Sequence, residues 1–441
     1  MRVELPAAAA EAAADTALDV RLEAPGKPEA AELETLRAAV TRCAEALVGA
    51  AFSDRDSAGW LSWELTADGR PTTMRGGNPA LYDGDSGTAY GCALLGVALD
   101  RSDLLDLAVR AARHAVRRSG GLGSGLLGGR AGVELAARRI ESLAGEHASA
   151  WTGASVSGPG EPSGCADSRW DTARAPRGSD LTDGLAGELY AAVRLLAPRA
   201  LQRRLVDDLA ARAVPGPVGL CWSDPSADPR PLCGLAHGAS GIALAAAEAA
   251  ACSPELASAA RGLVVGALAW ERAWFSPAGG SWPDLRSDPV SYPAWWCHGA
   301  AGIGLVRLRL LQLQRAGLDL GVSEPALLAE AGAAVRAASA ELARAVAAGG
   351  HSGGLTLCHG AGGALELLLA AADVLGVDEH RPLAARFAAA LVLGMDGDPL
   401  QWPTGLPVTG GGGLFLGLAG AAAVLARLAF PERHLSSVAL L

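Results

Sequence analysis

A short pattern, G-x-x-G followed by an apolar run, occurs seven times and constrains the fold of this chain more than any other feature. The first glycines of the seven copies are Gly84, Gly129, Gly184, Gly238, Gly299, Gly360 and Gly417. They span 333 residues in six steps, a mean of about 55 residues, which suits one pair of helices with its connections. Because the runs after the glycines carry few charges, they predict helices that are buried on most sides.

The segments between these runs have charged residues on one side and Ala, Leu or Val on the other. Residues 101–119, 201–214 and 324–348 are clear cases, and they predict amphipathic, half-exposed helices. An inner ring of seven buried helices inside an outer ring of about seven amphipathic helices satisfies both patterns. We therefore predict an all-α protein with the fold of an α/α toroid. In this fold the glycines would turn the backbone with positive φ, and the helix N-termini would crowd together at one end of the ring.

The limits of the repeat region set the expected domain boundaries. Residues 1–32 are rich in Ala and interrupted by prolines, which predicts a mobile leader, and residues 33–441 are expected to form a single toroidal domain. The Gly-, Pro- and Ser-rich stretch at 150–179 predicts an excursion over the active end of the ring. Three acidic residues within the first 15 interrupt any apolar signal-peptide core, so we expect a cytoplasmic protein.

The charge balance excludes several classes of partner and chemistry. A formal net charge of -10 repels phosphate backbones, so we expect no nucleic-acid partner. Lys27 is the only lysine, which excludes a P-loop and Schiff-base chemistry. The uncharged run before Arg427 is shorter than the roughly 20 apolar residues of a membrane-spanning helix, so no stable membrane insertion is expected.

Reactive side chains stand just before the first glycine in only some of the seven copies. These positions converge at one end of the ring, and two Cys with one or two His suit zinc. The residues alone leave open which histidine would bind. By contrast, Cys43, Cys92 and Cys252 are expected to be buried apolar residues, and His351 has only a weak claim to a site. The candidate site residues are Asp180, Asp183, His237, Cys297, His298, Cys358 and His359.

The strings LAHGASG, WWCHGAAG and LCHGAGG, in that order and at this spacing, resemble the three motifs of the lanthionine synthetase C-like (LanC-like) cyclases. The resemblance covers about residues 80–430. It implies an α/α toroid with one Zn²⁺ per chain, held by Cys297, Cys358 and His359 with a water in the fourth position. It also implies catalytic roles for His237 and Asp180.

Two features differ from the bacterial peptide cyclases. His298 stands where their tyrosine follows the second-motif cysteine, and SYPAWW contains no arginine where several of them carry one. The C-H-G sequence is more similar to the eukaryotic LanC-like proteins, some of which add glutathione to dehydrated residues. His298 is expected to lie beside the metal and to contact substrate or a bound water. The segment GNPALYDGDSGTAY resembles the first repeat of cyclase domains fused to lanthipeptide dehydratases.

Together these observations predict a zinc-dependent lanthionine synthetase that adds Cys thiols to dehydroalanine or dehydrobutyrine in a dehydrated precursor peptide. The metal would activate the thiol, and His237, oriented or charged by Asp180, would protonate the α-carbon. One open alternative is a LanC-like enzyme that adds glutathione or another small thiol. Another is a non-catalytic toroid that binds peptide or escorts a dehydratase or a kinase/lyase partner. A prenyltransferase tunnel is disfavoured by the few Phe and Tyr residues, and a glycosidase would have to rely on Asp180 and Asp183.

Overall fold

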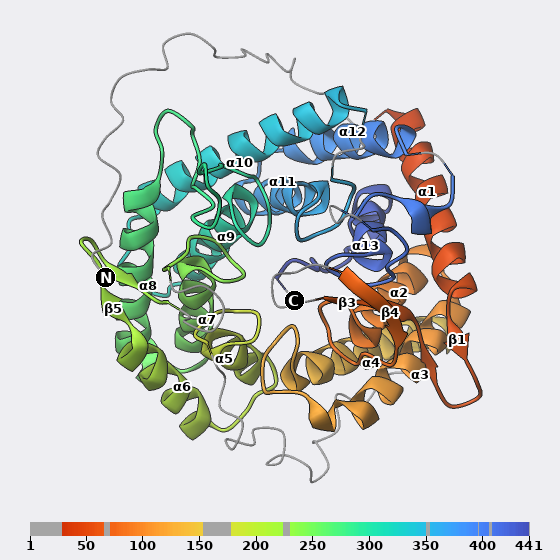
Figure 1. Cartoon of the computed structure of the whole chain (residues 1–441), viewed down its shortest axis with the longest axis horizontal. Coiled ribbons are helices and arrows are strands. Elements are labelled where there is room, and N and C mark those ends of the chain that lie inside the picture. Colours follow the sequence, from red (N-terminus) through yellow and green to blue (C-terminus); the bar gives the residue numbers. More distant parts are fainter. Residues whose placement is uncertain are drawn as a thin grey trace.

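A computed structural model describes residues 29–65, 71–152, 178–223, 230–349, 353–395, 397–404 and 408–440. Its helices form two concentric rings around a common centre, and the chain runs round both rings once (Figure 1). The predicted all-α toroid is therefore confirmed.

Seven helices form the inner ring, and each begins directly after the first glycine of a G-x-x-G copy. Each inner helix contacts the next one along the chain, and α13 contacts α2, so the inner ring is closed. The side chains of six of these helices are buried almost throughout, as the low charge of their runs predicts, whereas α4 is charged and partly exposed beyond its first two turns. The inner helices are α2 (Asp85–Leu99), α4 (Arg130–Thr152), α5 (Leu185–Arg194), α7 (Ala239–Cys252), α9 (Ala300–Arg315), α11 (Ala361–Leu375) and α13 (Leu418–Ala429).

The described residues contain six outer helices, and each packs against its inner neighbours. Helix α1 packs against α12 and α13, so the beginning of the described chain covers the last repeat (Figure 1). In the described part of the chain, no outer helix lies between α4 and α5. The outer helices are α1 (Ala30–Gly49), α3 (Ser102–Arg118), α6 (Arg199–Arg212), α8 (Ala257–Trp274), α10 (Glu324–Ala347) and α12 (His380–Leu393).

Two predicted boundaries change. Helix α1 begins at Ala30, so the ordered ring starts inside the predicted leader, and residues 1–28 lie outside the described residues. Helix α4 continues to Thr152, and residues 153–177 of the predicted excursion also lie outside the described residues.

The reason for the glycines differs from the prediction. Of the seven helix-start glycines, only Gly299 has a positive φ, 137°. What excludes a side chain is close approach of the backbone. At Gly129 a Cβ would lie 2.2 Å from the nitrogen of Gly125, and the second glycine of every copy would place a Cβ 1.6–2.7 Å from a carbonyl oxygen six residues earlier. Each loop is therefore folded tightly onto the start of its own helix.

Backbone hydrogen bonds join the seven helix-start loops into a closed circle, because each loop donates to the next. They run from the N–H of Tyr82 to the carbonyl of Leu127, Leu127 to Thr182, Leu181 to Ala236, Ala236 to Cys297, Trp296 to Cys358, Cys358 to Phe415, and Phe415 to Tyr82, at 2.8–3.2 Å. The residues at this end of the ring are thus held at fixed positions relative to one another.

Short antiparallel strand pairs lie in the connections between the helices. They were not predicted from the sequence. The β3–β4 hairpin lies over the near face in Figure 1, and Trp63 anchors it by donating from Nε1 to the carbonyl of Thr409 at 3.0 Å. The strands are β1 (Phe52–Ser53), β2 (Ala58–Gly59), β3 (Leu61–Leu65), β4 (Pro71–Gly76), β5 (Val214–Pro215) and β6 (Leu220–Cys221). Short 3₁₀ helices occupy Ser119–Gly121, Pro254–Leu256, Pro399–Gln401 and Pro431–Arg433.

Candidate metal centre

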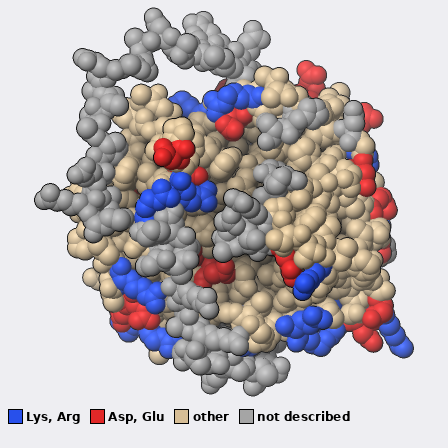
Figure 2. Space-filling model, in the orientation of Figure 1, with Lys and Arg blue, Asp and Glu red and all other residues tan. Residues whose placement is uncertain are grey.

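A cavity of about 930 Å³ lies at the end of the ring where the inner helices begin. Seen down the ring axis, this face is hollowed near its middle, with acidic and basic side chains at the edge of the hollow (Figure 2). Six of the residues that immediately precede a helix-start glycine line the cavity, so the predicted convergence of these positions occurs. They are Asp83, Gly128, Asp183, His237, His298 and His359.

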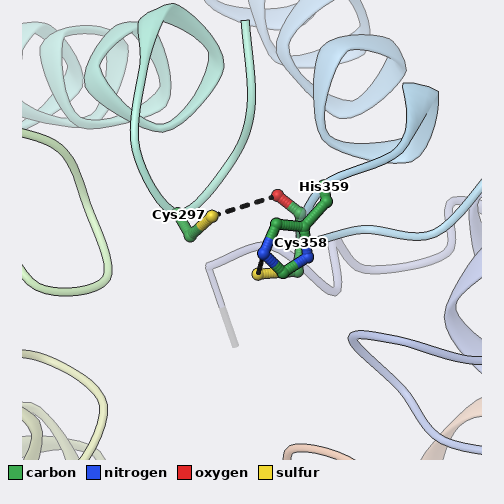
Figure 3. Close-up of side chains that lie close together, drawn as sticks. All are labelled: Cys297, Cys358 and His359. Atoms are coloured by element: carbon green, nitrogen blue, oxygen red, sulfur yellow. Dashed lines mark hydrogen bonds between the residues drawn. The ribbon is translucent and has the colours of Figure 1, made fainter. Parts of the chain in front are cut away.

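Two thiols and one imidazole form a compact cluster in this cavity. One ligand atom each from Cys297, Cys358 and His359 lie within 4.8 Å of one another. Figure 3 shows the cluster between the loop that enters α9 and the loop that enters α11. Cys297 Sγ lies 3.4 Å from the carbonyl oxygen of Cys358, and Cys358 Sγ lies 4.0 Å from Nε2 of His359.

The donor atoms of this cluster fit a borderline-soft cation such as Zn²⁺. Burial would raise the pKa of Cys297, but hydrogen bonds from Cys358 and His359 hold it well below its ordinary value. Burial and the adjacent Cys297 thiolate raise the pKa of Cys358 well above its ordinary value. Cys358 can therefore become a thiolate beside the Cys297 thiolate only if a cation lies next to the two sulfurs. Two thiol sulfurs and one imidazole nitrogen within 4.8 Å of one another are the donor types that zinc sites use.

Aromatic side chains hold the cluster from two sides. Tyr82, from the loop before α2, donates from its hydroxyl to Cys358 Sγ at 3.1 Å. The Tyr82 ring is stacked on Phe415, with centroids 5.2 Å apart. On the other side, the ring of Trp295 lies 5.5 Å from that of His359 in an edge-on arrangement. These contacts fix the orientation of one thiol and of the imidazole, as groups around metal ligands commonly do.

His237 lines the cavity and is paired with Asp180 of a neighbouring loop. Nδ1 of His237 lies 2.7 Å from Oδ2 of Asp180, whose Oδ1 accepts the backbone N–H groups of Asp183 and Gly184. Burial would lower the pKa of His237, but the hydrogen bond and the charge of Asp180 raise it above its ordinary value. Burial would likewise raise the pKa of Asp180, yet the hydrogen bond to His237 lowers it. The pair is therefore suited to hold a protonated imidazole beside the cavity.

A buried ionic network fixes the loop that carries His237. Glu271 on α8 accepts the backbone N–H groups of Gly234 and Ser240 at 2.8 and 3.0 Å. Its second oxygen pairs with Arg307 on α9 at 3.0 Å, and both side chains are fully buried. A buried pair with all its hydrogen bonds made is a rigid support. The loop position therefore depends on the outer ring as well as on the inner one.

His298 lies beside the cluster but outside it. Its ring is stacked on that of His237, with centroids 5.4 Å apart. The residue is 1 % exposed, and neither ring nitrogen has a hydrogen-bond partner among the described residues. Burial lowers the pKa of His298 to about 4, so the ring is neutral at pH 7. The identical C-H dipeptides at 297–298 and 358–359 thus take different positions in the structure.

Comparison with known proteins adds to this geometry. The family model described as "Lanthionine synthetase C-like protein" matches residues 77–441. This chain belongs to the lanthionine synthetase C-like family. No curated protein matches the chain. The match confirms the resemblance carried by the three glycine motifs and supports a cyclase or thiol-adding enzyme in general.

Several residues of the cavity in this lanthionine synthetase C-like protein were missed by sequence reasoning. Tyr82 and Asp83 could have been found, because Asp83 stands before Gly84 in the same register as His237 before Gly238. Arg286 had no such signal, since it lies in a long connection outside the repeat pattern. Its guanidinium lines the cavity and pairs with Asp284 at 2.8 Å. Arg286 thus supplies a positive charge in the cavity, although the segment SYPAWW before Cys297 contains no arginine.

The remaining candidates have mixed outcomes. Asp183 lines the cavity, and its Oδ1 accepts the backbone N–H of Gly128 at 2.9 Å. Cys43 and Cys92 are buried as expected, but the prediction for Cys252 is wrong, because it is exposed at the end of α7. His351 lies outside the described residues. Among the described helices, none has the length and apolar character needed to cross a membrane.

Proposed function

We propose that this protein is a zinc-dependent lanthionine synthetase that adds Cys thiols to dehydroalanine or dehydrobutyrine residues of a dehydrated precursor peptide, forming thioether rings. The observation that carries the proposal is the common cavity: the Cys297–Cys358–His359 cluster and His237 both line it, and Asp180 is hydrogen-bonded to His237. One group of residues suits thiol activation and the other suits proton transfer, and the reaction needs both.

The three cluster residues would hold one Zn²⁺ and leave a fourth position open, as in catalytic zinc sites. When bound, the ion would accept the substrate thiol and lower its pKa of about 8.5, so that a thiolate forms at neutral pH. Two thiolate ligands and one neutral imidazole cancel the charge of the ion. The thiol sulfur therefore keeps enough electron density to attack a carbon atom.

His237 would complete the addition. When sulfur bonds to the β-carbon of the dehydroamino acid, the electrons of the carbon–carbon double bond move towards the carbonyl oxygen. The protonated imidazole of His237 then delivers a proton to the α-carbon, and the proton released by the thiol restores the imidazole. Asp180 keeps that imidazole charged and oriented through its 2.7 Å contact with Nδ1.

The cavity has room for a segment of a peptide as well as for a small thiol. At about 930 Å³ it lies near the upper end of the roughly 300–1,000 Å³ range of small-molecule sites. The β3–β4 hairpin contributes polar side chains to its wall, among them Glu64 and Arg75. A dehydratase or a kinase/lyase enzyme would supply the dehydrated residues and is the expected partner.

The test uses the zinc-loaded protein and a synthetic peptide with one cysteine and one dehydroalanine, with and without glutathione. Free thiols are counted by alkylation and mass spectrometry. Loss of the peptide thiol without a change in mass supports cyclisation, whereas a mass increase of one glutathione indicates the small-thiol alternative. If neither occurs and the peptide still binds, the protein is a non-catalytic binding toroid. Cys92→Ala serves as a matched control for Cys358→Ala, because Cys92 is a buried thiol of α2 that does not line the cavity.

A further inference from the structure

Asp83 is a buried acid at the cavity wall with no assigned role. The residue is 6 % exposed, and its Oδ1 is buried without a hydrogen-bond partner among the described residues. A Cβ on Gly413 would lie 1.6 Å from this oxygen, so the carboxyl group fits only because residue 413 is a glycine. An unpaired buried carboxyl group destabilises a fold. Asp83 also lines the cavity, so a bound ligand can hydrogen-bond to its carboxyl group there.

The circle of loops fixes where Asp83 stands relative to His237. From the Tyr82 loop, the backbone bonds lead through the Leu127 and Leu181 loops to the loop of His237. In the other direction they pass Phe415 and both cysteine loops before they reach it. Asp83 and His237 thus face each other across the ring, and the thiol–imidazole cluster lies on the arc between them. A planar dehydroamino acid beside the cluster would have Asp83 on one side and His237 on the other.

The chemistry of the site calls for a hydrogen-bond donor on the side opposite His237. Negative charge develops on the carbonyl oxygen of the dehydroamino acid as sulfur attacks the β-carbon. A donor placed at that oxygen lowers the barrier. Burial raises the pKa of Asp83 to about 7, so a large fraction of the carboxyl group carries a proton at neutral pH. A carboxylic acid kept neutral by an apolar site can act as such a donor.

We propose that Asp83 is a further catalytic residue, whose carboxyl O–H donates a hydrogen bond to the carbonyl oxygen of the dehydroamino acid across the cavity from His237. Asp83 keeps its proton throughout. The new bonds are S–Cβ and Cα–H, and the bonds lost are the thiol S–H bond and the π bond between the α- and β-carbons, so that the elements of the thiol are added across that π bond. This role deepens the proposed thioether-forming function and rests on it.

The experiment compares Asp83→Ala and Asp83→Asn with the parent protein, in the assay of the cysteine–dehydroalanine peptide. Asp83→Ala should lower kcat about 100-fold, the usual effect of removing one donor to a developing oxyanion, and leave KM and zinc content within about twofold. Asp83→Asn, which keeps an N–H donor and has no charge, should retain most of the activity. Because Asp83 has an unpaired oxygen, Asp83→Ala should keep or raise the melting temperature.

Asp85→Ala is the matched control. Asp85 is a buried acid of the same loop region, but it accepts the backbone N–H of Trp60 at 2.9 Å and does not line the cavity. Removing it should lower the melting temperature and leave the kcat of the folded protein near that of the parent.

Three results would overturn the assignment: undiminished kcat in Asp83→Ala, equal damage in Asp83→Asn, or loss of zinc or of folding in both variants. If the parent protein itself fails to consume thiols, the proposed function is wrong, and that outcome is distinct from a failure of Asp83 alone.

Discussion

Tyr82→Phe tests whether the metal centre depends on a residue far away in the sequence. The substitution removes the hydroxyl that donates to Cys358 Sγ at 3.1 Å and keeps the ring that is stacked on Phe415. In the parent protein this hydrogen bond favours the charged form of the Cys358 thiol. A hydrogen bond to a charged group contributes about 1.5–3 kcal/mol. We therefore expect Tyr82→Phe to weaken zinc binding about 10- to 100-fold, in line with the usual effect of groups that support metal ligands.

The affinity is measured by titrating zinc against a chromophoric chelator at pH 7. Tyr190→Phe provides the control, because Tyr190 is buried and its hydroxyl also donates a hydrogen bond, to the carbonyl of Leu440 at 3.2 Å, away from the cluster. That variant should bind zinc as the parent does. Zinc affinity within twofold of the parent in Tyr82→Phe would show that the hydroxyl does not support the thiolate.

The remaining predictions concern the cluster and the proton donor. Cys358→Ala and His359→Ala should lose tight zinc binding, whereas His298→Ala should retain it and change rate or substrate preference; metal analysis with the reverse pattern for the two histidines would contradict the ligand set. His237→Asn should keep zinc and lose cyclisation by about 10² to 10⁴, and rates equal to the parent from pH 6 to 8 would exclude proton transfer by this residue. In Asp180→Asn, burial should lower the pKa of His237, so the loss of activity on the alkaline side should begin at lower pH; an unchanged rate–pH profile would contradict this.

The repeat pattern predicted the fold because each helix start needs a glycine for a purely local reason. The same register also predicted that residues before those glycines would meet, and His237 and His359 do line one cavity. It could not separate His298 from His359, because the difference lies in the backbone that follows. Gly299 has φ 137°, whereas Gly360 has φ -93°, so the two loops join their helices with different backbone conformations.

Other residues of the site do not recur with the G-x-x-G repeat, so the repeat could not predict them. Arg286 reaches the cavity from a connection whose course the repeat does not determine, and its pairing with Asp284 is a two-residue contact within that connection. Glu271 supports the His237 loop from an outer helix. In the sequence of an amphipathic helix, a buried acidic residue cannot be told from an exposed one. Tertiary contacts of this kind become visible only when the packing of the two rings is known.

The closed circle of loops also has a consequence for the order of folding. Adjacent helix pairs can form as the chain is synthesised, because their contacts are local. The backbone hydrogen bond from Phe415 to Tyr82 joins the last loop to the first, so it forms only after the seventh repeat has been made. Cys297, Cys358 and His359 come from consecutive loops and can gather before that point, but the Tyr82 hydroxyl arrives with closure. Tight zinc binding should therefore mark the moment at which a nascent chain completes its circle.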